Sequence, residues 1–361
     1  MLSLIDRYIV KRFLSVLFFT SLAFIAIFVV VDLIEHLDEF LANDASLMDS
    51  FLYYLYYIPY IVILTLPVNM LLSSLFSLGS MAQYNELIAL MSSGISLYRI
   101  ATPLLLLALS ISAASGVASE TLVPKANRLR LDIWRYDIRK QPRQMVGTRR
   151  EIALQDKADR QINILYFDGR RQKASRVNIV RIENNRVVER WDAKYMIWVP
   201  DSSGWMLRYV THRLFSDSTE QVVNEDTLWY TDTQISPDDL LDLQIKPEEM
   251  NYAELNRFVD KMLYLGADAR KWLVDLYFKI SYPFANFIIV LFGIPLASRK
   301  RRSGPALGFA LALLISFIYF LFIRTGQVLG HNGTLDPWLG AWIGNIVFGF
   351  CGISLMLSVR K

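Results

Sequence analysis

The chain has 361 residues, of which 53% are hydrophobic, and its mean hydropathy is +0.30. These values exclude an ordinary soluble protein, and a formal net charge of only +4 gives no reason to expect a nucleic-acid partner. The sole cysteine, Cys351, lies inside an apolar run, which excludes an intramolecular disulfide and a thiolate metal site.

Three long apolar runs occupy the first third of the chain. Residues 13–31 are free of charge and match the ~20 residues that cross a hydrocarbon core. No small-residue cleavage site follows this run, which argues against a signal peptide. The second run, at about residues 51–81, begins with clustered tyrosines typical of a membrane interface, and the third covers about residues 100–117.

Residues 83–96, QYNELIALMSSGIS, connect the second and third apolar runs and are expected to lie just outside the membrane. Asn85 can cap a helix start, and Glu86 then lies in the first turn, where the helix dipole favours a negative charge. Gly94 can end the same helix. The pattern predicts a short helix at the cytoplasmic membrane surface.

The apolar residues of this segment share one face of the predicted helix. Leu87, Leu90 and Met91 fall at i, i+3 and i+4, and Glu86 adds a single carboxylate beside them. Such a surface suits a membrane domain that a soluble motor pushes, so these four residues are the candidate coupling site. The alternative is a reverse turn whose glutamate merely faces water.

The character of the chain changes between Glu120 and about Asp268, where charges are dense and short alternating segments replace the apolar runs. Sequences at residues 184–185 and 201–204 are typical of hairpin turns. Several antiparallel strands without intervening helices predict a β-sandwich or jelly-roll-like domain. The expected strands are residues 161–167, 176–183, 186–199, 205–215 and 227–235.

Helical periodicity returns after Pro247, with an apolar stripe on a short helix and then three further spans. The sequence therefore predicts an α+β membrane protein with six transmembrane helices (3+3) and an inserted periplasmic β-jellyroll-like domain. We expect three parts: residues 1–120 with helices one to three, 121–268 with the β-domain, and 269–361 with helices four to six. The last three spans are expected at about residues 272–296, 306–323 and 338–357.

Positive charges in the short loops predict the orientation. Basic residues cluster at the N-terminus, at residues 299–302 and at residues 360–361, which places both termini and this loop in the cytoplasm. A basic run at residues 125–143 would by itself favour the opposite orientation. Long domains, however, translocate largely regardless of charge, so we let the short loops decide. The β-domain is then expected on the outer side.

No catalytic constellation emerges from the sequence. It has no GKS or GKT phosphate loop, no GxSxG elbow, and no histidine spacing typical of a metal site. Lys279 and Arg324 lie within spans, but both are near span ends, where a long cationic side chain can reach the interface. We expect no enzyme activity, no cofactor and no metal.

These features resemble the LptF/LptG family, the paired permeases of the lipopolysaccharide export machine. The resemblance covers essentially the whole chain, and Asp6-Arg7-Tyr8 slightly favours the LptG-like half of the pair. The matching motifs are IDRYI at residues 5–9, NELIALMSSGIS at 85–96, KISYPFANFIIVLFGIPLA at 279–297 and GTLDPWLGAWIGN at 333–345.

The resemblance implies an inner-membrane lipid exporter that serves outer-membrane biogenesis. Two such permeases sit on a cytoplasmic ABC ATPase dimer that uses the ATP, and a coupling helix docks into the ATPase with its glutamate at the interface. That helix maps onto residues 83–96 and the glutamate onto Glu86. A jelly-roll domain passes lipopolysaccharide to a periplasmic bridge protein of similar fold.

One departure concerns the lipid phosphates. The family resemblance implies a basic residue at the outer end of span one, where this chain has Asp32. Lys125, Arg128 and Arg135 are substitute headgroup candidates, since clustered cations near the outer leaflet attract anionic headgroups. A solvated amphipathic helix is the plainer interpretation of that run.

Two other function classes stay open on the sequence. The chain could be a force-transmitting subunit of another ABC-type complex, which would also need the coupling helix. It could instead be a membrane-anchored sensor or enzyme that uses the β-domain as its outer module, although no polar triad or metal cluster supports this.

Overall fold

The computed structural model describes residues 4–140, 148–157, 159–183, 186–200, 204–216, 219–233, 235–237, 240, 247–264, 268–298 and 305–358. The chain forms two compact units. The membrane unit comprises Met1–Arg139, Pro247–Tyr252 and Arg270–Lys361, and the β unit comprises Lys140–Lys246 and Ala253–Ala269.

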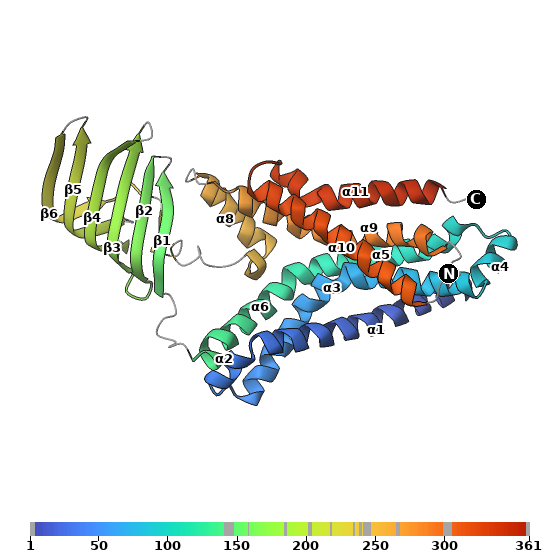
Figure 1. Cartoon of the computed structure of the whole chain (residues 1–361). Helices are drawn as coiled ribbons and strands as arrows, with labels where there is room; N and C mark the ends of the chain where they lie inside the picture. The colour runs from blue at the N-terminus through green and yellow to red at the C-terminus, as the bar shows by residue number, and fades with distance from the viewer. Residues whose placement is uncertain are drawn as a thin grey trace. The chain divides into compact units, whose positions relative to one another are not determined.

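Within the described residues, six helices are long and apolar enough to cross a membrane, which confirms the six predicted spans (Figure 1). Each expected run lies inside one of these helices, and each helix extends beyond its run because flanking polar and aromatic residues continue the helical backbone. The helices are α1 (Leu4–Glu35), α3 (Leu47–Gln83), α5 (Leu97–Thr121), α9 (Arg270–Ser298), α10 (Pro305–His331) and α11 (Pro337–Ser358).

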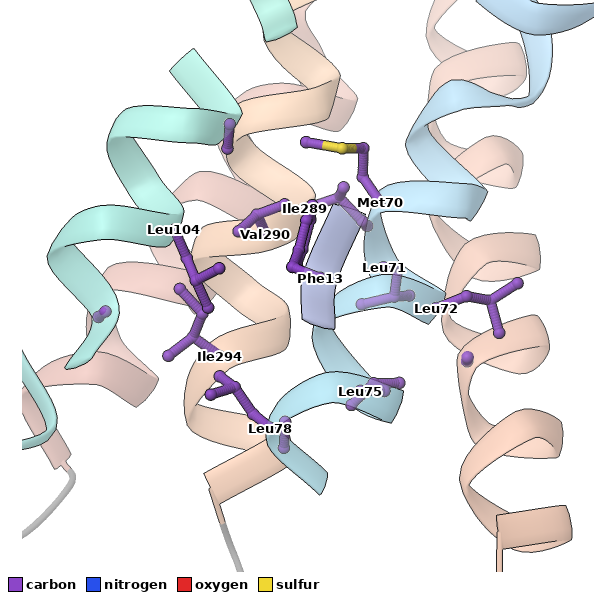
Figure 2. Packing of buried hydrophobic residues seen from close by; sticks show 14 of the residues in the cluster. Phe13, Met70, Leu71, Leu72, Leu75, Leu78, Leu104, Ile289, Val290 and Ile294 are labelled. Carbon is purple, nitrogen blue, oxygen red and sulfur yellow. The ribbon is translucent and has the colours of Figure 1, made fainter. Parts of the chain in front are cut away.

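The core of the membrane unit is built around α3 and α9. In the most apolar stretch of α3, 72% of the residues are buried, against none in that of α1. Figure 2 shows side chains from four helices meeting in this core: Phe13 of α1, Leu71 of α3, Leu104 of α5 and Ile289 of α9. Helix α3 is therefore the centre of the unit, and α1 lies at its edge.

Helices α10 and α11 approach each other through glycines. A Cβ atom on Gly326 would lie 2.5 Å from the carbonyl oxygen of Gly340, and one on Gly344 would lie 2.8 Å from Cγ1 of Ile323. Gly330 meets the same face of α11, since a Cβ there would lie 3.4 Å from Cα of Gly340. Small residues four apart on both helices thus let the two backbones touch.

Short helices close the end of the membrane unit where α1 ends and α3 begins. They are α2 (Leu37–Ala42), α6 (Val123–Asp132) and a π-helical turn, η1 (Ile133–Ile138). Phe40, Tyr53 and Trp134 pack together there. Arg139 donates two hydrogen bonds of 2.7 Å to the carboxylate of Glu39, and this bonding holds the pKa of Glu39 below its ordinary value.

The β unit is one antiparallel sheet of six strands in the order β1 to β6. The sequence led us to expect a sandwich or jelly roll, whereas every described strand pairs with its neighbours along the chain, as in a meander. This confirms an inserted antiparallel β-domain. The strands are β1 (Thr148–Lys157), β2 (Arg160–Asp168), β3 (Lys173–Glu183), β4 (Arg186–Val199), β5 (Gly204–Ser216) and β6 (Thr219–Tyr230).

The prediction of individual strands was best in the middle of the sheet. The interior strands β2 to β5 were expected close to their observed bounds, and the turn residues 184–185 and 201–203 lie outside the described residues. Strand β1 was missed, and β6 begins at Thr219 where we expected residue 227. Both are edge strands, and most side chains of β6 are exposed, so apolar alternation is weak there.

One face of the sheet carries the core of the β unit. The indole of Trp205 is fully buried against Phe167 and donates a hydrogen bond of 2.7 Å to the carbonyl oxygen of Ile235. On α8 (Tyr252–Tyr264), the predicted apolar stripe is buried at Leu255 and Val259. Both observations agree with the alternation and periodicity seen in the sequence.

A row of residues with strained backbone crosses the sheet. Glu151 in β1, Arg176 in β3 and Tyr209 in β5 have positive φ angles of 53°, 53° and 54°. The strand registers place Leu165 of β2 and Lys194 of β4 between them, on the same line. Because non-glycine residues rarely adopt positive φ, each of the three stores backbone strain, and the three lie on one line across the strands.

Candidate functional site

The candidate coupling segment folds as α4, Glu86–Ser92, which is shorter than the predicted residues 83–96. Gly94 ends the helix as expected: its φ is +89°, its amide donates to the carbonyl of Met91, and the Ile95 amide donates to that of Leu90. The capping role predicted for Asn85 is wrong. Its backbone is left-handed, not extended as at a usual cap, and its side chain makes no capping hydrogen bond.

The apolar stripe of α4 faces the membrane unit's own core. Leu87 is 1% exposed, and Leu90 and Met91 are half-buried against the same cluster. Leu87 is therefore held by the membrane unit itself, while Leu90 and Met91 keep part of their surface exposed. The exposed apolar residues here are Tyr84 and Ile88, at 69% and 43% exposure.

Glu86 is held by the first turns of α1. The hydroxyl of Tyr8 donates to Glu86 Oε2 over 3.0 Å, and Arg12 Nη1 lies 3.3 Å from the same oxygen. Arg12 Nη1 also donates to the Tyr8 hydroxyl over 2.8 Å, which closes a three-membered polar cluster. The structure thus places a basic residue of the same chain beside Glu86.

A second polar contact joins α1 to the start of α5. Arg99 donates two hydrogen bonds, of 2.8 and 2.9 Å, to the carboxylate of Asp6, whose side chain is only 6% exposed. The Ser96 side chain caps α5 by accepting from the Arg99 amide. Sequence reasoning missed this pair, although the Asp6-Arg7-Tyr8 motif was an available signal.

The three headgroup candidates are in different environments. Lys125 is exposed, whereas Arg128 donates from Nε to the backbone oxygen of Glu249 over 2.9 Å. Arg135 Nη2 lies 3.9 Å from Oε1 of the same Glu249. Arg128 and Arg135 therefore converge on one glutamate, and Lys125 presents its ammonium to the surroundings.

Asp32 lies near the end of α1. Its side chain is mostly enclosed, with Oδ2 3.6 Å from Nδ1 of His36. Nearby, the guanidinium of Arg130 lies 4.0 Å from the ring centroid of Tyr57, in cation–π geometry. Asp32 thus takes part in packing between helices, and sequence reasoning did not anticipate the role of Arg130.

Lys279 and Arg324, the two cations singled out within the expected spans, are also in different environments. Lys279 Nζ lies 3.4 Å from Oε1 of Glu120, so a carboxylate neutralises it. Arg324 is exposed and donates from Nη1 to Oε1 of Gln327 over 3.0 Å. Among the described residues, no group of three histidine, cysteine, aspartate or glutamate side chains could hold a metal ion.

Comparison with known proteins decides the family. The family described as "Lipopolysaccharide export system permease LptF/LptG" matches residues 7–358. The chain belongs to the LptF/LptG family. This confirms the resemblance seen in the sequence motifs.

Similar LptF/LptG proteins include both halves of the pair. The chain is 22% identical to the permease protein LptG of Escherichia coli K12, over 99% of this chain and 98% of that protein. It is 21% identical to LptG of Haemophilus influenzae, over 96% of each. The match to LptF of E. coli K12 is 27% identical but covers only 27% of each chain. The longer LptG matches weakly support the LptG-like half.

Proposed function

We propose that this chain is the transmembrane permease subunit of an ATP-driven exporter that extracts lipopolysaccharide from the inner membrane. The observation that carries the proposal is the family match over residues 7–358, together with six membrane-spanning helices and an inserted β unit. A permease is not itself an enzyme, and in this proposal the energy comes from ATP used by a partner subunit. The chain needs no cofactor of its own.

The proposed ATP-using partner is a cytoplasmic ABC ATPase dimer that docks on α4. The ATPase would contact the face of this segment that carries Tyr84 and Ile88, which are exposed. Leu87 is buried against the membrane unit, so its side of the helix is already covered. Glu86 adds a carboxylate at the edge of this face, with 37% of its side chain exposed. A basic groove on the partner would complement this surface.

A second permease is the proposed neighbour within the membrane. Relatives named LptG and LptF both match the chain, which supports a pair of paralogous subunits. Much of α1 is available for such contact, since Phe18, Phe19 and Ile27 are more than half exposed. Lipid covers whatever part of this surface the partner leaves open.

We propose that both termini are cytoplasmic and the β unit is periplasmic. The basic clusters at the N-terminus and at residues 299–302 support this orientation. A cysteine placed at residues 299–302 should be shielded from an impermeant reagent applied outside, and one placed at residues 201–204 should react. The reverse labelling pattern would overturn the orientation.

The β unit is proposed to pass lipid to a periplasmic bridge protein of jelly-roll fold. Strands β1 and β6 are the two ends of the strand order, and an unpaired edge can accept a strand from a partner. Photo-crosslinkers along β1 and β6 should each be tested for a discrete adduct with a soluble periplasmic protein. Crosslinks confined to the permease pair would contradict this step.

Lys125 is the proposed headgroup contact among the three original candidates. Its exposure leaves the ammonium available to a lipid phosphate, whereas Arg128 and Arg135 are engaged with Glu249. Lys125→Gln should lower lipopolysaccharide retention in the purified complex more than Arg135→Gln does. Equal retention in both variants would remove Lys125 from the site.

Gentle purification in detergent tests the whole proposal. We expect the ATPase, a second permease and bound lipopolysaccharide to be recovered with this chain. Recovery of the ATPase without any lipid would favour the second class, a force-transmitting subunit of another ABC-type complex.

A further inference from the structure

Two polar contacts tie one short stretch of α1 to both ends of the segment between α3 and α5. At the start of this segment, Tyr8 and Arg12 meet Glu86. Just beyond its end, in the first turn of α5, Arg99 forms a two-pronged ion pair with Asp6. Asp6, Tyr8 and Arg12 lie within two turns of α1, so this stretch contacts the start of α4 and the start of α5.

This stretch is also where α1 is anchored to the rest of the unit. The buried residues of α1 are Asp6, Ile9 and Phe13. Farther along, its most apolar stretch has no buried residue, although Asn69 donates a hydrogen bond to Ser21 there. The most deeply buried part of the long, peripheral α1 is therefore the stretch that contacts α4.

Helix α4 depends on such contacts for its own structure. With seven residues it is far shorter than the ~12–15 residues at which isolated helices become even marginally stable. Leu87 holds the helix to the core, and the neighbouring Glu86 holds it to α1 through a charge-assisted contact. Loss of either contact should loosen the helix.

We propose that Asp6, Tyr8 and Arg12 form a clamp that positions α4 and transmits its displacement to α1. The three are positioning residues, since they act through α4. The claim that these residues position α4 depends only on the contacts described above. The consequence for lipid export rests on the proposed function.

Glu86 can serve the clamp and a partner at once. Both clamp contacts end on Oε2, and the side chain remains 37% exposed. Arg12→Gln therefore weakens the clamp while leaving the carboxylate in place for a partner. Lys11, the adjacent and exposed cation, provides the matched control.

A charge swap tests the clamp in the full chain purified alone in detergent. Arg12→Glu and Glu86→Arg should each speed amide hydrogen exchange in residues 87–92 by up to about fivefold, the factor that corresponds to the ~1 kcal/mol that a partly exposed ion pair contributes at most. The double variant, with the pair reversed, should return exchange close to the wild-type rate. Lys11→Glu should have no such effect.

Failure of the swap to restore protection would overturn the clamp, and so would an equal effect of Lys11→Glu. This readout needs no ATPase, so it stands or falls independently of the proposed function.

Transmission is tested in the complete complex with the ATPase. Arg12→Gln should keep the wild-type ATPase content and KM for ATP, while lipopolysaccharide-stimulated turnover falls by up to about fivefold, by the same conversion. Lys11→Gln should behave as wild type. Normal stimulated turnover in Arg12→Gln, despite faster exchange in α4, would overturn transmission to α1. Absence of any stimulation in the wild-type complex would instead refute the proposed function and leave the exchange result intact.

Discussion

The glycine contact between α10 and α11 yields a prediction with a worked magnitude. In Gly326→Ala, the new Cβ would lie 2.5 Å from the Gly340 carbonyl oxygen and 2.4 Å from Cγ2 of Ile343. The isoleucine can rotate, but the carbonyl is backbone, so the helices must separate by close to an ångström. Overpacking of this kind costs ~1–3 kcal/mol.

Gly308 provides the control in the same helix, because nothing lies within 4 Å of a Cβ built there. Alanine is a better helix former than glycine by ~0.5–1 kcal/mol, so Gly308→Ala should leave stability unchanged or raise it.

Equilibrium unfolding in mixed detergent and SDS, followed by tryptophan fluorescence, measures both variants. The account predicts that the free energy of unfolding falls in Gly326→Ala only. A Gly326→Ala protein as stable as wild type would refute the close helix approach.

Three further predictions concern separate parts of the chain. Ile88→Asp should preserve amide protection in α4 but reduce ATPase recovery at least tenfold, as loss of an interface anchor of ~2 kcal/mol does, whereas Leu87→Asp should abolish the protection itself. Glu39, whose pKa the Arg139 hydrogen bond lowers from 4.5, should add stability above pH 4.5 and lose this contribution as the pH falls below it. The melting temperatures of wild type and Glu39→Gln should therefore differ at pH 7 and converge as the pH falls through the folded-state pKa of Glu39. Arg176→Gly should stabilise the β unit by ~1 kcal/mol in thermal melts, because glycine tolerates the φ of +53°.

The sequence predicted features that depend on neighbouring residues. Apolar length is a local property, so all six spans were found, and the left-handed turn at Gly94 was expected because glycine is the residue that adopts it without strain. Interior strands were predicted well because burial on one face imposes alternation.

What the sequence could not predict depends on which surfaces meet. The spacing of Leu87, Leu90 and Met91 showed that they share a face, but only the packing of α4 revealed that this face points inward. The partners of Glu86 lie 78 and 74 residues away in sequence, so no local pattern could indicate Tyr8 or Arg12.

Transfer of lipopolysaccharide from proteoliposomes is the most direct test of the central claim. The complete complex is reconstituted with lipopolysaccharide, and a soluble periplasmic bridge protein carrying a photo-crosslinker is added outside. The account predicts lipid adducts on the bridge that accumulate only during ATP hydrolysis and only when this chain is present. Continued ATP hydrolysis with no ATP-dependent adduct would contradict it.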